Sequence, residues 1–300
     1  MTVQAHGVLR PILHGEVAKL ARDKVEDIPR RRLDGTATIN PALLLHRLWL
    51  GDYSDGRDDA LARALQAAHL RAVADACRNV PADLLDALHA RRAAAAEALV
   101  TRHLRPTWTW CSVRIEPMWR LVVGHGEDSV HETSLTLSPT YGVPMLPGTA
   151  LKGLAAAAAR DEAGDAGWSE PDTTVFGSPR PGQSSQAHRG SVLIWDALPV
   201  STPTLVLDVL TPHVKDYYDE GNSGGKTKDA PTTPPAEYHN PVPIRFLAVE
   251  KTPFRAYVLG PAPDVARCVG LLKHGLDEFG IGGKTAAGYG YCSASEEVPG

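Results

Sequence analysis

The sequence predicts an α+β fold, in which an N-terminal helical region precedes a β-α-β-β-α-β unit. Three observations predict it. Apolar residues recur at helical spacing between residues 41 and 105, strand-like runs begin after Pro106, and two amphipathic helical segments interrupt those runs. With 300 residues, 43% of them hydrophobic, the chain is long enough to bury a substantial core.

Residues 1–40 are polar and mixed in composition, and we expect them to form an N-terminal arm. A helical subdomain is expected at 41–105, with Asn40 as its N-cap and Pro41 at the first helical position. Pro81 interrupts the helical pattern, which then resumes. Before this proline, one helical stripe contains Leu61, Leu65, Ala68, Ala72 and Ala76.

The β-rich part of the chain follows. Its strand-like runs, rich in β-branched and aromatic residues, occupy residues 107–115, 119–126, 190–200, 204–214, 242–260 and 289–292. A first helix with Thr149 as N-cap and a second with Asp264 as N-cap are expected between them. This order is typical of a ferredoxin-like (RRM-like) unit with its helices on one sheet face, which we expect at 106–295. Residues 216–240 contain too many turn formers for regular structure, so a flexible loop is expected there.

The segment FGIGGKTAAGYGYC, residues 279–292, contains five glycines, and its function is not obvious from composition. It is not a P-loop, because Glu278 stands where the first glycine is required and the segment follows a helix instead of preceding one. Two interpretations stay open. The loop binds an anion through backbone N–H groups and Lys284, with Tyr289 or Tyr291 stacking a base, or it is a tight turn that needs positive φ.

Three stretches of the chain, residues 133–160, 173–195 and 279–295, contain no Asp or Glu, although the chain has 35 acidic residues. The cations inside them, besides Lys284, include Lys152, Arg180 and Arg189. We interpret the three stretches as parts of one local groove that binds an anionic ligand. Lys152 also lies near the start of a predicted helix, where free N–H groups attract phosphate. A further candidate segment ends a strand before the long loop and carries His213, Lys215, Tyr217 and Tyr218.

Charge and cysteine usage limit the function classes. Free-standing nucleic-acid-binding proteins are more often basic, whereas this chain has a net charge of −4, so any polyanion site must be local or shared with partner subunits. The four cysteines are scattered without a C-x-x-C pair, which favours a reducing cytoplasm over a zinc site or a disulfide framework. No signal peptide and no membrane-spanning segment are expected.

The ordered set of motifs LPGTALKG, FG at 176–177, GSVLIWDALP, LVLDVLTPHVKDYY, PVPIRFLAVE and GIGGKTAAGYGYC resembles the RAMP superfamily of type III CRISPR effectors. Within it, the resemblance is to the family of the sixth subunit of the type III-B (Cmr) complex, over roughly residues 119–292. It implies contact with the 3′ region of a CRISPR guide RNA. It also implies assembly with other Cmr subunits, especially backbone RAMP subunits, for targeting foreign RNA.

The resemblance also implies site residues. In the family a C-terminal glycine-rich loop contacts the CRISPR RNA, and the matching residues here are Gly280, Gly282, Gly283, Lys284, Thr285, Gly288, Tyr289 and Gly290. A second family motif near the RNA matches Thr149, Lys152 and Gly153. A non-catalytic subunit without cofactor or metal is therefore expected. One alternative is a RAMP endoribonuclease that processes CRISPR transcripts and uses His125, His131 or His213 as general acid or base. A metal-dependent nuclease is a weaker alternative, because the Asp-rich runs fall in loop or helix-flanking sequence.

Overall fold

The computed structural model describes residues 39–47, 59–103, 107–126, 133–164, 170–177, 188–211 and 243–297. Helices and antiparallel strands make up most of these ranges, which confirms the predicted α+β class. The predicted arm, apart from residues 39 and 40, and the predicted loop at 216–240 lie outside the described residues.

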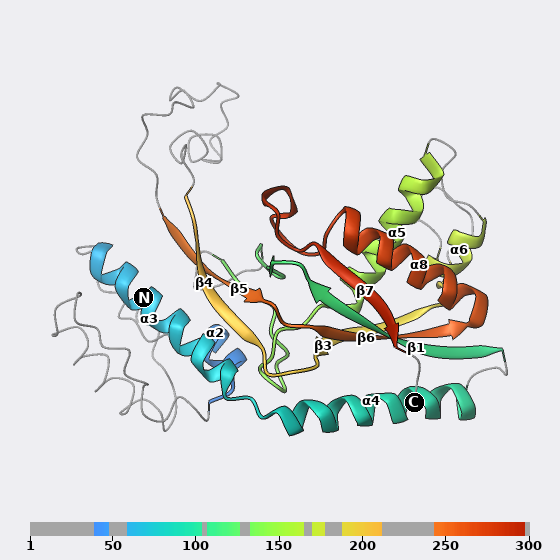
Figure 1. The fold of residues 1–300 in the computed structure, drawn as a ribbon, viewed down its shortest axis with the longest axis horizontal. Coiled ribbons are helices and arrows are strands. Elements are labelled where there is room, and N and C mark those ends of the chain that lie inside the picture. Colours follow the sequence, from blue (N-terminus) through green and yellow to red (C-terminus); the bar gives the residue numbers. More distant parts are fainter. Residues whose placement is uncertain are drawn as a thin grey trace.

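A four-stranded sheet forms the centre of the molecule, with the strand order β3-β6-β1-β7 and antiparallel neighbours throughout. Helix α5 connects β1 to β3, and helix α8 connects β6 to β7, so the order is that of the predicted ferredoxin-like unit. Both helices cover the same face of this sheet (Figure 1). The elements are β1 (Trp108–Pro117), α5 (Gly148–Ala163), α6 (Glu170–Phe176), β3 (Leu193–Pro199), β6 (Phe254–Pro261), α8 (Ala262–Glu278) and β7 (Cys292–Glu297).

A second, three-stranded sheet has the order β2-β5-β4. Strand β2 (Arg120–Leu121) directly follows β1, and β4 (Thr204–Leu210) and β5 (Ile244–Glu250) are inserted between β3 and β6. Strands were predicted in these regions, but nothing in the sequence assigned them to a separate sheet. β2 is only two residues long, and Gly124, with φ of 82°, soon turns the chain away from the extended direction.

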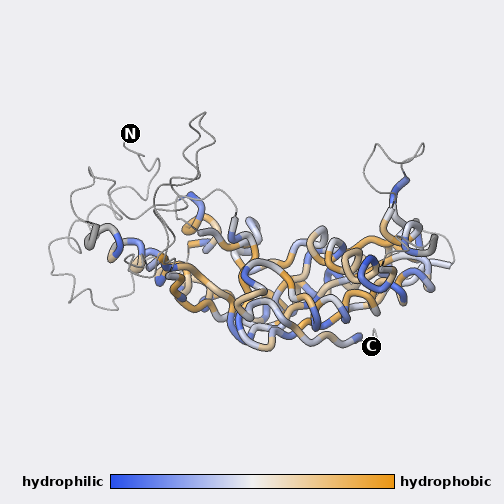
Figure 2. The backbone as a smooth tube through the Cα atoms, turned by 90° about the horizontal axis from the view of Figure 1, so that it is seen from above, coloured by the Kyte–Doolittle hydropathy of each residue, from blue (hydrophilic) through white to orange (hydrophobic). Residues whose placement is uncertain are grey.

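The N-terminal helices are α2 (Pro41–Arg47), α3 (Asp59–Arg78) and α4 (Ala82–His103). The predicted cap of α2 is confirmed, because Asn40 Oδ1 accepts the Ala42 N–H at 2.8 Å. Helix α3 packs on β4 and β5, and α4 runs along β1 and β6 on the face opposite α5 and α8 (Figure 1). One buried cluster joins Leu44 and Leu70 to Ile115 and Leu272. The residues of this cluster come from many parts of the described chain, and Figure 2 shows hydrophobic segments spread along it.

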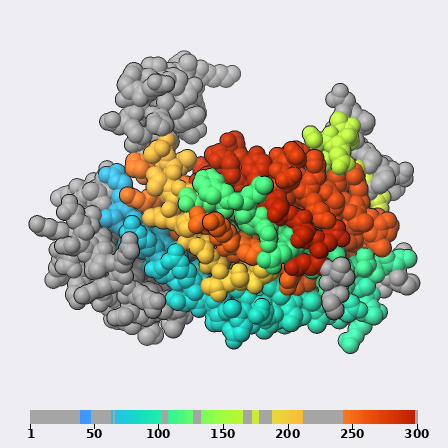
Figure 3. All heavy atoms as spheres, in the orientation of Figure 1, coloured from blue at the N-terminus to red at the C-terminus, as the bar shows by residue number. Residues whose placement is uncertain are grey.

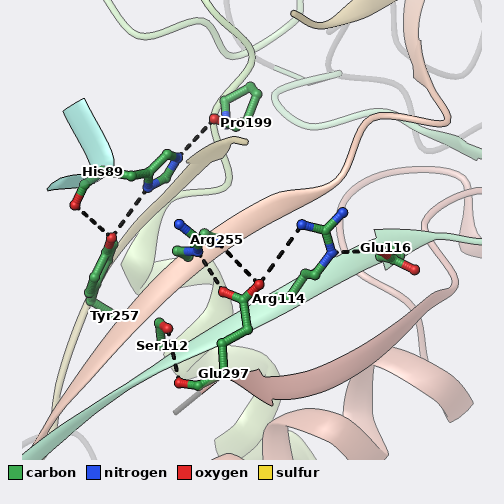
Figure 4. A network of polar contacts seen from close by, with 8 residues as sticks. All are labelled: His89, Ser112, Arg114, Glu116, Pro199, Arg255, Tyr257 and Glu297. Carbon is green, nitrogen blue, oxygen red and sulfur yellow. Dashed lines mark hydrogen bonds and ion pairs between the residues drawn. The ribbon is translucent and has the colours of Figure 1, made fainter. Parts of the chain in front are cut away.

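Polar contacts fix helix α4 to the central sheet (Figure 4). His89 Nε2 lies 2.8 Å from the Pro199 carbonyl oxygen, and the Tyr257 hydroxyl donates to the His89 carbonyl oxygen at 3.0 Å. Burial lowers the pKa of His89. Nearby, Arg255 Nε and Glu297 Oε2 are 2.5 Å apart. The two His89 contacts therefore stabilise the packing of α4 on β3 and β6, whereas the Arg255–Glu297 pair joins β6 to β7.

Two predicted helix caps are wrong. Helix α5 begins at Gly148 and helix α8 at Ala262, so Thr149 and Asp264 lie inside the first turns. A proline with extended ψ precedes each helix and offers no side-chain cap. For α5 the missing acceptor comes from strand β3, where Asp196 Oδ1 accepts the Gly148 N–H at 2.7 Å.

Candidate nucleic-acid interface

The glycine loop, defined here as residues 280–290, connects helix α8 to strand β7 beyond the end of strand β1 (Figure 1). Two backbone hydrogen bonds hold it against the segment around β2. The Gly283 N–H donates to the Val122 carbonyl at 2.7 Å, and the Gly290 N–H donates to the Arg120 carbonyl at 2.8 Å. The loop is therefore bound to the three-stranded sheet at two points.

Several glycines in this loop are required by its own fold. Gly282 has φ of 91°, and a Cβ there would lie 2.2 Å from the Val122 carbonyl oxygen. Gly290 has φ of 80°, and a Cβ there would lie 2.1 Å from the Ile281 carbonyl oxygen. No other residue fits such positions without backbone movement. The tight-turn interpretation thus accounts for these two glycines.

Tyr289 is the residue that anchors the loop from inside. Its side chain is buried, and its ring lies 5.0 Å from the Trp119 ring and 6.0 Å from the Phe246 ring. Its hydroxyl donates to Asp208 Oδ2 at 2.6 Å. Burial and then this carboxylate raise the pKa of Tyr289 to about 12. Its position is explained by packing, and its ring is not presented to a ligand.

Asp208 joins this anchor to a small charge network. Arg120 donates to Asp208 Oδ2 at 2.7 Å and to Glu250 Oε1 at 3.0 Å. Burial raises the pKa of Asp208, but hydrogen bonds from Tyr289, from the Val209 N–H and from Arg120 outweigh it, so the net direction is downward. The ionised carboxylate holds β2, β4 and the loop together.

Lys284 has no carboxylate partner among the described residues. It adopts left-handed backbone angles, φ 62° and ψ 32°, and its ammonium lies 6.0 Å from the Phe246 ring centroid. Burial lowers its pKa. Among the described residues, neither its ammonium nor the backbone N–H groups of Lys284, Thr285 and Ala286 have an acceptor. The bend therefore presents one cation and three donors to an anion.

His125 lies beside this bend. Its Cβ is 3.2 Å from where a Gly283 side chain would begin, and its ring is 5.7 Å from the Phe246 ring. Burial, followed by the charge of Lys284, lowers the pKa of His125. Within the described part of the chain its Nδ1 is buried without a hydrogen-bond partner. Of the three histidines considered for nuclease chemistry, His131 and His213 lie outside the described residues.

The start of helix α5 differs from the expected phosphate site. Its Gly148 N–H is already bonded to Asp196, which supplies the negative charge that the helix dipole favours. Lys152 Nζ donates to the Val192 carbonyl oxygen at 2.8 Å. Burial lowers the pKa of Lys152, and the positive charge of Arg189 lowers it further.

Three other predicted residues in this region, Thr149, Gly153 and Arg189, are exposed. A Cβ on Gly153 would meet no atom of the described residues within 4 Å, so no packing in these ranges explains a helix-interior glycine there. Four predicted residues beyond strand β4 and one before strand β3 lie outside the described ranges: His213, Lys215, Tyr217, Tyr218 and Arg180.

Sequence reasoning missed two exposed residues beside the glycine loop, Met118 and Trp119. Met118 precedes the strand-like run 119–126 and Trp119 begins it, and no periodicity distinguishes an exposed tryptophan there from a buried one. Within the described ranges, no three potential ligands are grouped as a metal ion requires. No helix in those ranges has the length and apolar character needed to cross a membrane.

A family model described as the RAMP superfamily matches residues 115–293 of this chain. Over 224 residues the chain is 31% identical to a Pyrococcus furiosus protein named CRISPR system Cmr subunit Cmr6. This match covers 57% of the chain and 64% of that protein, so just under two thirds of the relative is spanned.

A chain of the type III-B Cmr-beta complex bound to cognate target RNA, determined by cryo-EM, gives a TM-score of 0.58 at 18% identity. That match covers 97% of this chain and 89% of the other, and it supports the fold. The crystal structure of Cmr6 from Pyrococcus furiosus gives 27% identity over 63% of this chain and 99% of that one, with a TM-score of 0.35, too low to compare the folds.

Proposed function

This chain belongs to the RAMP superfamily, and we propose that it acts as a non-catalytic RNA-binding subunit of a type III-B (Cmr) CRISPR effector complex. In this proposal it contacts the 3′ region of the CRISPR guide RNA. It also helps to assemble the other Cmr subunits, especially the backbone RAMP subunits, for targeting foreign RNA in the cytoplasm. The relative named as a Cmr subunit and the fold shared with a Cmr-beta chain support this choice.

One observation carries the proposal: Lys284 and the N–H groups of residues 284–286 have no acceptor among the described residues. A half-buried ammonium normally has an oxygen partner, because desolvation without one costs free energy. Three backbone donors at the same bend suit a phosphate, whose oxygens accept several hydrogen bonds at once. The glycine loop therefore matches a phosphate of the guide strand better than a neutral ligand.

Replacing Lys284 with alanine tests the proposal, and Lys251→Ala is its matched control. Lys251 and Lys284 are the two non-glycine residues with positive φ in the described ranges, so both variants leave an alanine in the same kind of conformation. Complexes assembled with each variant are titrated with labelled guide RNA over a range of salt. We expect Lys284→Ala to weaken binding about tenfold and to reduce the salt slope by about 0.7. Unchanged affinity and slope would contradict the proposal.

The endoribonuclease alternative has one supporting observation, the position of His125 beside Lys284. A neutral histidine next to a cation is a suitable general base for RNA cleavage by the 2′-hydroxyl. The full chain, incubated with repeat RNA, separates the two functions. Cleavage that disappears in His125→Ala while RNA binding persists would favour the enzyme, and intact RNA with the wild-type chain would favour the non-catalytic subunit.

A further inference from the structure

Met118 and Trp119 form an exposed pair at the bend between β1 and β2. Met118 is 66% exposed and Trp119 is 44% exposed. The other large apolar residues exposed in the described ranges are aliphatic and lie singly: Leu43, Leu84 and Val209. Single exposed aliphatic residues are common on protein surfaces, but an exposed indole beside a second apolar side chain is not.

The indole of Trp119 is held in place by its neighbours. Its ring centroid is 5.0 Å from that of Tyr289, at an interplanar angle of 41°. The Arg120 guanidinium lies 5.1 Å from the same ring and is itself fixed by the carboxylates of Asp208 and Glu250. The neighbouring backbone is fixed as well, because the Met118 N–H donates to the Tyr291 carbonyl oxygen at 2.9 Å. An exposed ring positioned in this way loses little conformational entropy when it binds.

Trp119 and Lys284 both contact the same buried residue, Tyr289. The Tyr289 N–H donates to the Lys284 carbonyl oxygen at 3.3 Å, and its ring is in contact with Trp119. The Phe246 ring lies 6.0 Å from Tyr289 and 6.0 Å from the Lys284 ammonium. The segment that follows β1 and the C-terminal segment are neighbours on the face drawn in Figure 3. The exposed ring and the Lys284 ammonium, which has no acceptor among the described residues, are therefore within reach of a few consecutive nucleotides.

We propose that Trp119 stacks on a base of the RNA strand whose phosphate is bound by Lys284 and the backbone N–H groups of residues 284–286. This inference rests on the proposed function and adds a base contact to it. An aromatic ring beside a phosphate-binding loop is the arrangement that single-stranded nucleic-acid sites use, and it accepts any base because every base has a π face. Tyr289, the tyrosine next to the loop's cation, is buried beneath this position.

The surroundings favour RNA over a protein partner. Two adjacent side chains form too small an apolar area for a stable protein interface, which needs roughly 800 Å² on each partner. Next to them lie a cation and N–H donors that have no acceptor in the described part of the chain, and such groups bind a polyanion. A protein partner is accordingly one of the outcomes that the experiment distinguishes.

The test uses complexes assembled with Trp119→Ala, with the conservative variant Trp119→Phe, and with Leu84→Ala as a control that removes an exposed apolar side chain from helix α4. Each is titrated with labelled single-stranded RNA of guide length and with the same oligomer made abasic. We expect Trp119→Ala to bind the intact RNA about tenfold more weakly, with an unchanged salt slope because no charge is lost. Trp119→Phe should recover most of the affinity, and Leu84→Ala should match the wild type.

The abasic oligomer isolates the stacking contribution. It should bind the wild type and Trp119→Ala equally, because no base is present to stack. Equal binding of intact RNA by Trp119→Ala and the wild type overturns the inference, and so does an equal loss with both oligomers. Loss of a Cmr subunit from the purified complex, with RNA affinity retained, overturns it in favour of a protein contact. If Lys284→Ala weakens binding while Trp119→Ala does not, the inference fails and the proposed function stands; if neither does, both fail.

Discussion

Replacing Lys284 with glycine separates the stability of the glycine loop from its affinity for RNA. Lys284 has φ 62° and ψ 32°, close to the ideal left-handed conformation. A residue with a Cβ is strained there by about 1–2 kcal/mol, and glycine removes that strain. Glycine also gives the unfolded chain more freedom, which costs about 0.4–1 kcal/mol.

The remaining contribution to stability is the contact of the ammonium with the Phe246 ring, 6.0 Å away, which is worth about 0.5 kcal/mol at a partly exposed site. These opposing effects nearly cancel. We therefore expect the free energy of unfolding of Lys284→Gly to stay within about 1 kcal/mol of the wild type. Affinity for guide RNA should nevertheless fall about tenfold, because a charge-assisted contact with phosphate is lost.

Urea unfolding of the full chain measures the first quantity, and titration of assembled complexes with guide RNA at several salt concentrations measures the second. Lys251→Gly is the control, since Lys251 is exposed, has φ of 46° and should gain the same relief of strain without a change in RNA affinity. Two results would refute the reasoning. One is a loss of RNA affinity by the Lys251 control equal to that of Lys284→Gly, and the other is strong destabilisation of Lys284→Gly, which would make any loss of binding a consequence of unfolding.

Three further predictions concern other positions. Gly153→Ala should raise the free energy of unfolding by about 0.5–1 kcal/mol, because the site is open and helical. It should also weaken RNA binding if the RNA approaches α5 closely, and an unchanged affinity would leave Gly153 outside the interface. Gly290→Ala should lower the free energy of unfolding by about 3 kcal/mol, since a Cβ would meet the Ile281 carbonyl oxygen at 2.1 Å, and denaturant unfolding at wild-type concentrations would contradict this. Burial lowers the pKa of His89 from 6.5, so its contribution to stability is complete above that pH and is lost as the pH falls below it; urea unfolding at pH 7 and pH 5 should show a smaller loss for His89→Gln than for the wild type.

Local patterns in the sequence determined much of the secondary structure. The helix that became α8, strand β6 before it and the Asn40 cap of α2 follow from periodicity and from the chemistry of neighbouring residues. The last strand was predicted at 289–292 and lies instead at Cys292–Glu297, because the preceding tyrosines and glycines belong to the loop. The alternation of strands and helices also predicted the ferredoxin-like order of the central sheet. These features are predictable because the interactions that define them act between residues a few positions apart.

Long-range contacts decided the candidate site. Tyr289 is buried against Trp119 and Phe246, and its hydroxyl reaches Asp208, 81 positions away. The first N–H of α5 is satisfied by Asp196, 48 positions away, in place of the local threonine. The three-stranded sheet likewise joins strands from separate parts of the chain.

By itself, the sequence determined that the glycine segment is unusual and carries a lysine without nearby acids. Only the tertiary structure showed which residues of the segment are needed for the fold. Gly282 and Gly290 are needed because a Cβ at either position would clash with backbone, whereas Lys284 has no hydrogen-bond acceptor among the described residues. The structure alone also placed an exposed Trp119 beside them. The physical reason is that exposure and the pairing of a charge depend on which distant segments fold against a residue, and local sequence does not specify those segments.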